Sequence, residues 1–201
     1  MKKTLFICLL ICINLSVGKA VTSDPVTAVI VMEDGTTKEG LVDFPLTNGS
    51  KNIKIKINGE TEKIESNLIK KITFKSGTSI INYFNMKVYS TTGNKILDKK
   101  QFLSYAVEGK VNLYIGTGII NFGYNGNSRI SNNVTSYYCI RDGEPAAKLI
   151  HENFGQVNKN ADFKLYASRY FEDNKIIYDK IKNKEYTYKD IYIVVNEYNK
   201  K

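Results

Sequence analysis

Residues 52–64 read Asn-Ile-Lys-Ile-Lys-Ile-Asn-Gly-Glu-Thr-Glu-Lys-Ile, and this stretch decides the fold class. Three isoleucines alternate with Lys54, Lys56 and a polar residue, which is typical of a strand with one buried and one solvated face. Asn58-Gly59 is a hairpin-turn signal, so the residues after it are predicted to return antiparallel. The stretch therefore predicts a β-hairpin within an antiparallel sheet.

The surrounding sequence repeats this organisation. Residues 26–32 are rich in β-branched side chains, and Asp34-Gly35 supplies the positive φ angles of a two-residue hairpin before a second strand over 36–44. Residues 65–69 are expected to form one helical turn ahead of a strand over 71–74. Five short strands predict a small curled sheet over residues 21–76, SH3-like or Sm-like in outline, a likeness of shape that implies no function.

The β character continues as a meander over residues 77–155. Strands are predicted at residues 79–88, 102–107, 111–115, 134–141 and 146–150. The stretch 116–133 is rich in Gly, Asn and Ser, which predicts either a mobile connection or the tip of a long hairpin.

After Gly155 the hydrophobic period changes from two to about 3.6. The pattern predicts about three helices over residues 156–201, the first at 162–171 and the second capped by Asn174. Thr187 and Asp190 approximate a capping box at the start of the third helix. Strands first and helices last predict an α+β chain whose C-terminal helices pack on the sheet.

The N-terminus has the pattern of a secretory signal peptide over residues 1–20. Two lysines precede an apolar stretch over residues 4–17, and small residues flank a predicted cut after Ala20. The apolar stretch is shorter than the roughly 20 residues that a membrane-spanning helix needs. Export to the periplasm or the cell surface is therefore expected. Cleavage leaves Cys139 as the only cysteine, which excludes an intrachain disulfide and favours a small buried hydrophobe.

Few catalytic patterns occur in the sequence. The single histidine, His151, cannot form a histidine-based metal site alone, and we expect a solvated or hydrogen-bonded loop residue. No Gly-x-Ser-x-Gly nucleophile elbow or complete phosphate-binding loop is found, and the sequence predicts neither a cofactor nor a metal. Scattered carboxylates leave one enzymatic alternative, a hydrolase of envelope glycan or peptide in which two of Glu144, Glu152 and Asp173 share a pocket.

The charge of the chain offers a further alternative. Its 201 residues carry a formal net charge of +9, almost entirely from lysine, and they include only three arginines. Lys54 and Lys56 on the solvated face of one predicted strand are candidates for binding a polyanion, either an acidic glycan or an anionic lipid. Arginine binds phosphate better than lysine does, so its scarcity argues against nucleic acid as a partner.

Several segments, taken in order, resemble a family of uncharacterised exported proteins of Gram-negative bacteria. They are the signal peptide, the hairpin over residues 29–42, Phe102 with residues 107–114, Tyr137-Tyr138 before Arg141-Asp142-Gly143, residues 170–174, and residues 181–186 with Tyr198-Asn199. Members of that family often carry Cys where this chain has Asn174. The resemblance implies export and a shared fold, and it carries over no catalytic residue.

These observations lead to one principal hypothesis, a non-enzymatic binding or accessory module of the cell envelope. Its partner is expected to be another envelope component, either a protein or a glycan. Functional residues favour long loops on rigid scaffolds, so the stretch 116–133, with Tyr124 and Arg129, is the predicted contact surface.

Overall fold

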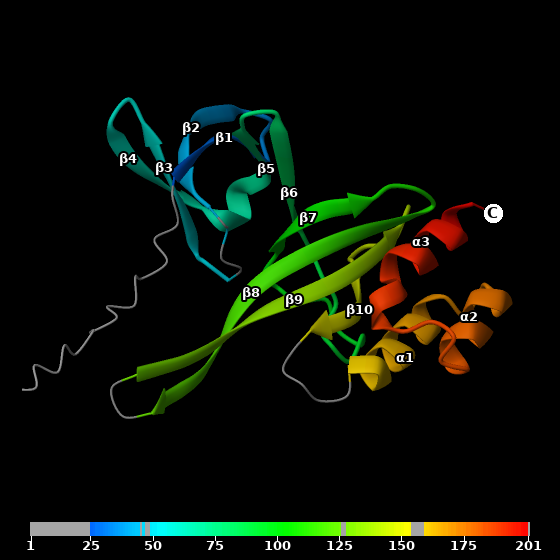
Figure 1. The fold of residues 1–201 in the computed structure, drawn as a ribbon. Helices are drawn as coiled ribbons and strands as arrows, with labels where there is room; N and C mark the ends of the chain where they lie inside the picture. The colour runs from blue at the N-terminus through cyan, green and yellow to red at the C-terminus, as the bar shows by residue number, and fades with distance from the viewer. Residues whose placement is uncertain (1–24, 45, 47–48, 126–127, 154–158, 201) are drawn as a thin grey trace, which may run out of the picture.

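The computed structural model describes residues 25–44, 46, 49–125, 128–153 and 159–200, with 119–125 and 128–133 described by their backbone alone. Ten antiparallel strands form one sheet in the order β10-β9-β8-β7-β6-β5-β1-β2-β3-β4 (Figure 1). The strands are β1 (Pro25–Met32), β2 (Thr37–Asp43), β3 (Asn52–Ile57), β4 (Glu60–Glu65), β5 (Ile69–Ser76), β6 (Ser79–Met86), β7 (Gln101–Val107), β8 (Val111–Asn125), β9 (Ser128–Arg141) and β10 (Lys148–Asn153). Together with the C-terminal helices, this sheet confirms the predicted α+β class.

Strands β1–β5 curl around a core to which β6 and β7 also contribute, with Tyr83 and Phe102 (Figure 1). Ile30, Ile55 and Ile72 are fully buried in it, as the alternating pattern predicts. The hairpin between β3 and β4 has the expected two-residue turn, with φ of 50° at Asn58 and 91° at Gly59. The expected single helical turn is present as the 3₁₀ helix η1 (Ser66–Leu68).

The turn between β1 and β2 differs from the prediction. Gly35 has a positive φ of 86°, whereas Asp34 is not among the residues with positive φ. The Met32 N–H donates to the Thr36 carbonyl at 2.8 Å, so the loop contains three residues rather than two. The Asp34 carboxylate instead accepts a hydrogen bond from the Thr36 N–H at 2.9 Å, which stabilises the wider turn.

Strands β8 and β9 form one long hairpin. Their pairing runs from Val111 opposite Arg141 to Asn125 opposite Ser128, with a register shift between Asn121 and Gly123. The stretch 116–133 is therefore the hairpin alternative rather than a loop, because cross-strand pairing continues through its glycines.

The helices follow the last strand and cover β8–β10 (Figure 1). They are α1 (Lys159–Tyr170), α2 (Lys175–Lys182), the 3₁₀ turn η2 (Tyr188–Asp190) and α3 (Ile191–Asn199). Both predicted caps are confirmed: the Asn174 side chain accepts from the Ile177 N–H, and Thr187 with Asp190 forms a capping box. No helix within the described ranges is long and apolar enough to cross a membrane.

Candidate ligand-binding site

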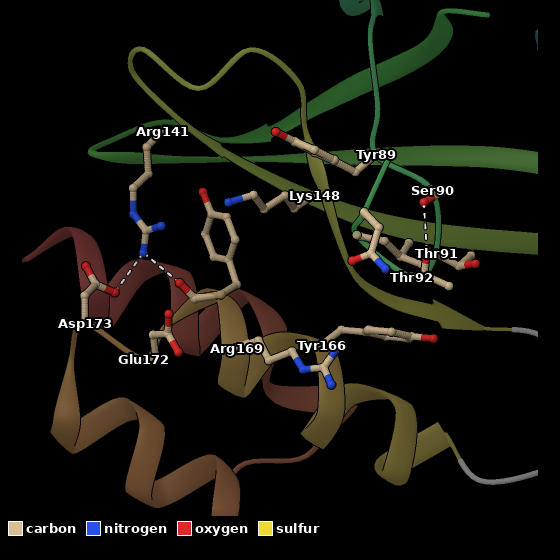
Figure 2. Close-up of a pocket in the computed structure, with 14 residues that line it drawn as sticks. Tyr89, Ser90, Thr91, Thr92, Arg141, Lys148, Tyr166, Arg169, Glu172 and Asp173 are labelled. Carbon is tan, nitrogen blue, oxygen red and sulfur yellow. Dashed lines mark hydrogen bonds and ion pairs between the residues drawn. The ribbon is translucent and has the colours of Figure 1, made fainter. Parts of the chain in front are cut away.

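A pocket of about 460 Å³ lies between the segment after β6, the start of β10 and the end of α1 (Figure 2). Its lining combines hydroxyl, aromatic and charged side chains from parts of the chain that are far apart in sequence. The lining residues are Tyr89, Ser90, Thr91, Thr92, Gly93, Asn94, Arg141, Lys148, Leu149, Tyr166, Arg169, Tyr170, Glu172 and Asp173. A pocket of this size suits one or two sugar units or a comparable small molecule.

The residues 89–94 form one wall because a compact turn is attached to the sheet there. The Tyr89 N–H donates to the Ala147 carbonyl at 2.9 Å, and the Gly93 N–H donates to the Ser90 carbonyl at 2.8 Å. Gly93 has a φ of 76°, which favours glycine at this position. The turn presents three hydroxyl side chains and an amide to the pocket, groups that both donate and accept hydrogen bonds.

Tyrosine rings and Lys148 line the middle of the pocket. The Lys148 ammonium lies 5.7 Å from the ring centroids of both Tyr89 and Tyr170, within the range of cation–π attraction. Burial raises the pKa of Tyr170, so its hydroxyl stays protonated and donates to Glu144 at 3.0 Å. The pocket therefore offers both aromatic faces and a positive charge.

Arg141 lies at one end of the pocket, where its guanidinium is hydrogen-bonded to three other residues. Its Nη2 donates to the Tyr170 carbonyl and to Asp173 Oδ1, each at 2.8 Å, as the dashed lines in Figure 2 show. Its Nε donates to the Tyr198 hydroxyl at 3.3 Å, and its guanidinium lies 4.3 Å from the Tyr170 ring centroid. These contacts join the β9–β10 turn to the ends of α1 and α3, so Arg141 positions the site.

Glu144 is the counterion of this cluster. Burial acts to raise its pKa, but hydrogen bonds from the Arg141 N–H, the Tyr170 hydroxyl and the Lys148 ammonium outweigh burial and lower it. The donors lie at 2.8, 3.0 and 3.2 Å. Glu144 is therefore a carboxylate with its oxygens occupied by donors.

Arg169 differs from the other cations of the pocket. It stands in the last turn of α1 and is exposed, and Figure 2 shows it beside Tyr166. Among the residues that the structure describes, no carboxylate lies within ion-pair distance of its guanidinium. Arg169 is consequently available for a bidentate contact with an anionic group.

The predicted surface lysines lie away from this pocket. Lys54 and Lys56 are exposed on β3, and in the strand register they lie opposite Lys63 and Thr61 of β4. Tyr124 and Arg129 face each other across β8 and β9 in the backbone register, and their side chains are outside the described residues. The structure thus does not bring Lys54 or Lys56 into the pocket.

The three carboxylates of the hydrolase alternative are divided between two places. Glu144 and Asp173 both contact Arg141, at 3.6 and 2.8 Å. Glu152 instead lines a second pocket of about 350 Å³ and accepts from the Ser136 hydroxyl at 2.7 Å. A glycosidase needs one protonated carboxylic acid, and the lowered pKa of Glu144 does not suit this residue to that role.

Cys139 and His151 are both fully buried. Burial raises the pKa of the Cys139 thiol and keeps it protonated, in accord with the predicted small hydrophobe. The prediction of a loop histidine is wrong: His151 belongs to β10 and its ring is stacked between Tyr137 and Tyr188. Neither of its ring nitrogens has a hydrogen-bond partner among the described residues.

No group of three or more His, Cys, Asp or Glu that would hold a metal ion occurs within the described part of the chain. Comparisons with protein-family models, with curated proteins and with solved structures find no match for this chain.

Of the residues that line the pocket, sequence reasoning named Asp173 as a site candidate and missed the others. Two of the three arginines of the chain, Arg141 and Arg169, line it, and their rarity is a signal in the composition. The run Ser90-Thr-Thr-Gly-Asn94 is a second signal, because it concentrates hydrogen-bonding side chains in one tight turn. Neither signal shows by itself that these residues converge.

Proposed function

We propose that the protein is an exported, non-catalytic binding protein of the cell envelope whose pocket holds an acidic sugar unit. The N-terminal sequence pattern and the resemblance to exported proteins support the location. The proposal keeps the SH3-like or Sm-like outline for residues 21–76 as a scaffold, without a function of its own.

The observation that carries the proposal is one pocket that combines aromatic faces and hydroxyl groups with a guanidinium, that of Arg169, which has no ion-pair partner among the described residues. Arg169 offers a bidentate contact to a carboxylate, and Lys148, which is paired with Glu144 at 3.2 Å, lines the same pocket. The tyrosine rings present flat apolar faces on which the C–H face of a sugar ring packs. The turn over residues 90–94 offers hydrogen bonds to sugar hydroxyls. An acidic sugar has a carboxylate, an apolar C–H face and hydroxyl groups, which complement these three features of the pocket.

A titration calorimetry experiment tests this proposal with trigalacturonic acid as the probe. Its fully methyl-esterified form is the matched control, because esterification removes the charge and keeps the sugar shape. We expect the acid to bind at least about tenfold more tightly than the ester, because a hydrogen bond to a charged group contributes about 1.5–3 kcal/mol. Equal binding of both forms, or of neither, would contradict the proposal.

Variants then locate the binding. Arg169→Gln and Lys148→Gln are each expected to weaken binding of the acid by about tenfold. The double variant Lys54→Gln/Lys56→Gln removes two charges from an exposed strand elsewhere and is expected to leave binding unchanged. A loss only in the double variant would instead favour the polyanion surface on β3. Cleavage of the probe during the titration would favour the hydrolase alternative.

A further inference from the structure

The second pocket, of about 350 Å³, lies on the face of the sheet opposite to the helices. The side chains of β9 alternate between the two faces: Tyr137 and Cys139 belong to the helix-covered core, whereas Val134, Ser136 and Tyr138 line this pocket. Among the described residues, it shares no lining residue with the pocket around Arg169. It is therefore a separate site, of a volume that suits a small molecule.

Two glycines of β8 explain why the sheet is hollowed here. In the strand register Gly116 lies opposite Ser136 and Gly118 opposite Val134, so β8 contributes no side chain at these two positions. Gly118 is not among the glycines with positive φ, and no atom of the described residues lies within 4 Å of the place that a Cβ at 118 would take. A glycine inside a strand weakens it and often marks a place where a ligand approaches the backbone closely. Neither conformation nor packing within the described chain requires glycine at 118, whereas a ligand against the strand would.

Opposite charges line the pocket without forming an ion pair with each other. Glu152 is partly buried, and its carboxylate accepts a hydrogen bond from the Ser136 hydroxyl at 2.7 Å. Lys99 is exposed and lines the pocket from the segment that leads into β7. Within the described ranges, neither Glu152 nor Lys99 has an oppositely charged group at ion-pair distance, whereas the neighbouring Lys100 pairs with Glu33. The pocket thus offers a carboxylate and an ammonium at separate places.

The remaining side chains of the pocket that bear on a ligand are neutral. Burial and the charge of Glu152 raise the pKa of Tyr138 to about 12, so its hydroxyl stays protonated and donates to the Gln101 side-chain oxygen at 3.2 Å. Leu97 and Val134 add apolar surface. A ligand with only positive charge would be repelled by the lysines, and a ligand with only negative charge by Glu152. A molecule that carries both charges complements the lining.

We propose that this second pocket binds a small zwitterion, an amino acid or a dipeptide, whose ammonium contacts Glu152 and whose carboxylate contacts Lys99. Each contact is a hydrogen bond between charged groups, the stronger kind in proteins. The bare backbone at Gly118 leaves room for the main chain of the ligand, and Leu97 and Val134 contact an apolar side chain. The site does not depend on the acidic-sugar site proposed above.

Titration calorimetry of the full chain tests the proposal with L-alanyl-L-alanine and L-alanine as probes. We expect at least one of them to bind with a Kd below about 1 mM, and the tighter probe identifies the dipeptide or the amino acid as the ligand type. The matched controls are the N-acetylated and the C-amidated form of that probe, each of which lacks one charge. Each is expected to bind at least about tenfold more weakly. Binding of neither probe, or equal binding of a capped form, would overturn the proposal.

Two charge variants assign the contacts. Glu152→Gln is expected to abolish the preference for the free amine over its acetylated form, and Lys99→Gln the preference for the free carboxylate over its amide. Lys95→Gln is the matched control, because Lys95 is an exposed lysine of the same segment that does not line the pocket. We expect this variant to bind as the wild type does. Charge preferences that persist in Glu152→Gln and Lys99→Gln would contradict the assignment.

Filling the hollow at position 118 gives a measurement that does not depend on charge. Gly118→Val is expected to abolish binding without lowering the midpoint of thermal unfolding, because valine favours strands more than glycine does. Gly118→Ala fills less space and is expected to weaken binding by about tenfold with the fold retained. Arg169→Gln is expected to leave binding of these probes unchanged, which separates this site from the acidic-sugar site. A folded Gly118→Val variant that binds as the wild type does would overturn the proposal.

Discussion

The curled strands β1–β5 and the helix-covered strands β8–β10 share antiparallel pairing but enclose different side chains. The first core is dominated by isoleucines from β1, β3, β4 and β5, and the ion pair of Lys38 with Glu62 lies at the surface of this region. The second core contains a buried histidine and borders the partly buried Arg141 cluster. The difference indicates that the first region mainly provides a scaffold, whereas the second region maintains polar groups in the fixed positions that a binding site requires.

The largest expected effect is the loss of stability when a core side chain is truncated, and this change also tests whether the two regions unfold together. Phe171 and Ile55 are fully buried, one in each core. We expect Phe171→Ala to lower the free energy of unfolding by about 4 kcal/mol and Ile55→Ala by about 3 kcal/mol. Strand β6 joins the regions by pairing with β5 on one side and β7 on the other, so both variants are expected to shift one common transition in calorimetry. Two separate transitions would show that the cores are independent.

The buried imidazole predicts a pH dependence specific to the second region. Burial lowers the pKa of His151 from 6.5 to about 4, so between these values the unfolded chain takes up a proton that the folded chain does not. Above pH 6.5 the free energy of unfolding is not reduced by His151. As the pH falls from 6.5 toward 4, protonation of His151 in the unfolded chain lowers the free energy of unfolding by about 3 kcal/mol in total. Urea unfolding at pH 7.0 and 4.5 measures this change.

The variant His151→Phe is the control for that measurement. It keeps an aromatic ring between Tyr137 and Tyr188 and removes the titrating group. We expect a smaller loss of stability between pH 7.0 and 4.5 in this variant than in the wild type. An equal loss in both proteins would assign the acid sensitivity to other groups.

The smallest expected effect compares an ion pair from each region. Arg141→Met removes hydrogen bonds to Tyr170 and Asp173 from a partly buried cluster and is expected to cost about 2 kcal/mol of stability. Lys38→Met breaks the solvent-exposed pair with Glu62 and is expected to cost about 0.5 kcal/mol or less. Thermal unfolding of both variants measures the difference. Equal losses would mean that the Arg141 cluster contributes no more than a surface pair.

The first region was largely predictable because its signals are local. Alternating isoleucines and Asn58-Gly59 each specify structure within a few residues. The caps at Asn174 and Thr187 are equally local signals for the helices of the second region. The hairpin over 116–133 was ambiguous, because its glycines and asparagines favour turns while its pairing depends on the opposite strand.

The candidate site was not predictable from such local patterns. Tyr89, Arg141 and Asp173 meet only after the sheet and helices are assembled. Likewise, the position of His151 in β10 does not specify its burial, which depends on Phe163 and Tyr188 from segments that follow.

The side chain of Asn199 fastens the end of α3 to the beginning of β8. Its Oδ1 accepts from the Val111 N–H and its Nδ2 donates to the Val111 carbonyl, each at 2.9 Å. A ribosome makes Val111 long before Asn199, at roughly 5–20 residues per second. The helices that cover β8–β10 are therefore synthesised several seconds after β8 begins. The strands of the early hairpins are synthesised one directly after the other. Until the helices are present, the apolar side chains of the second core lack the cover that the complete chain gives them.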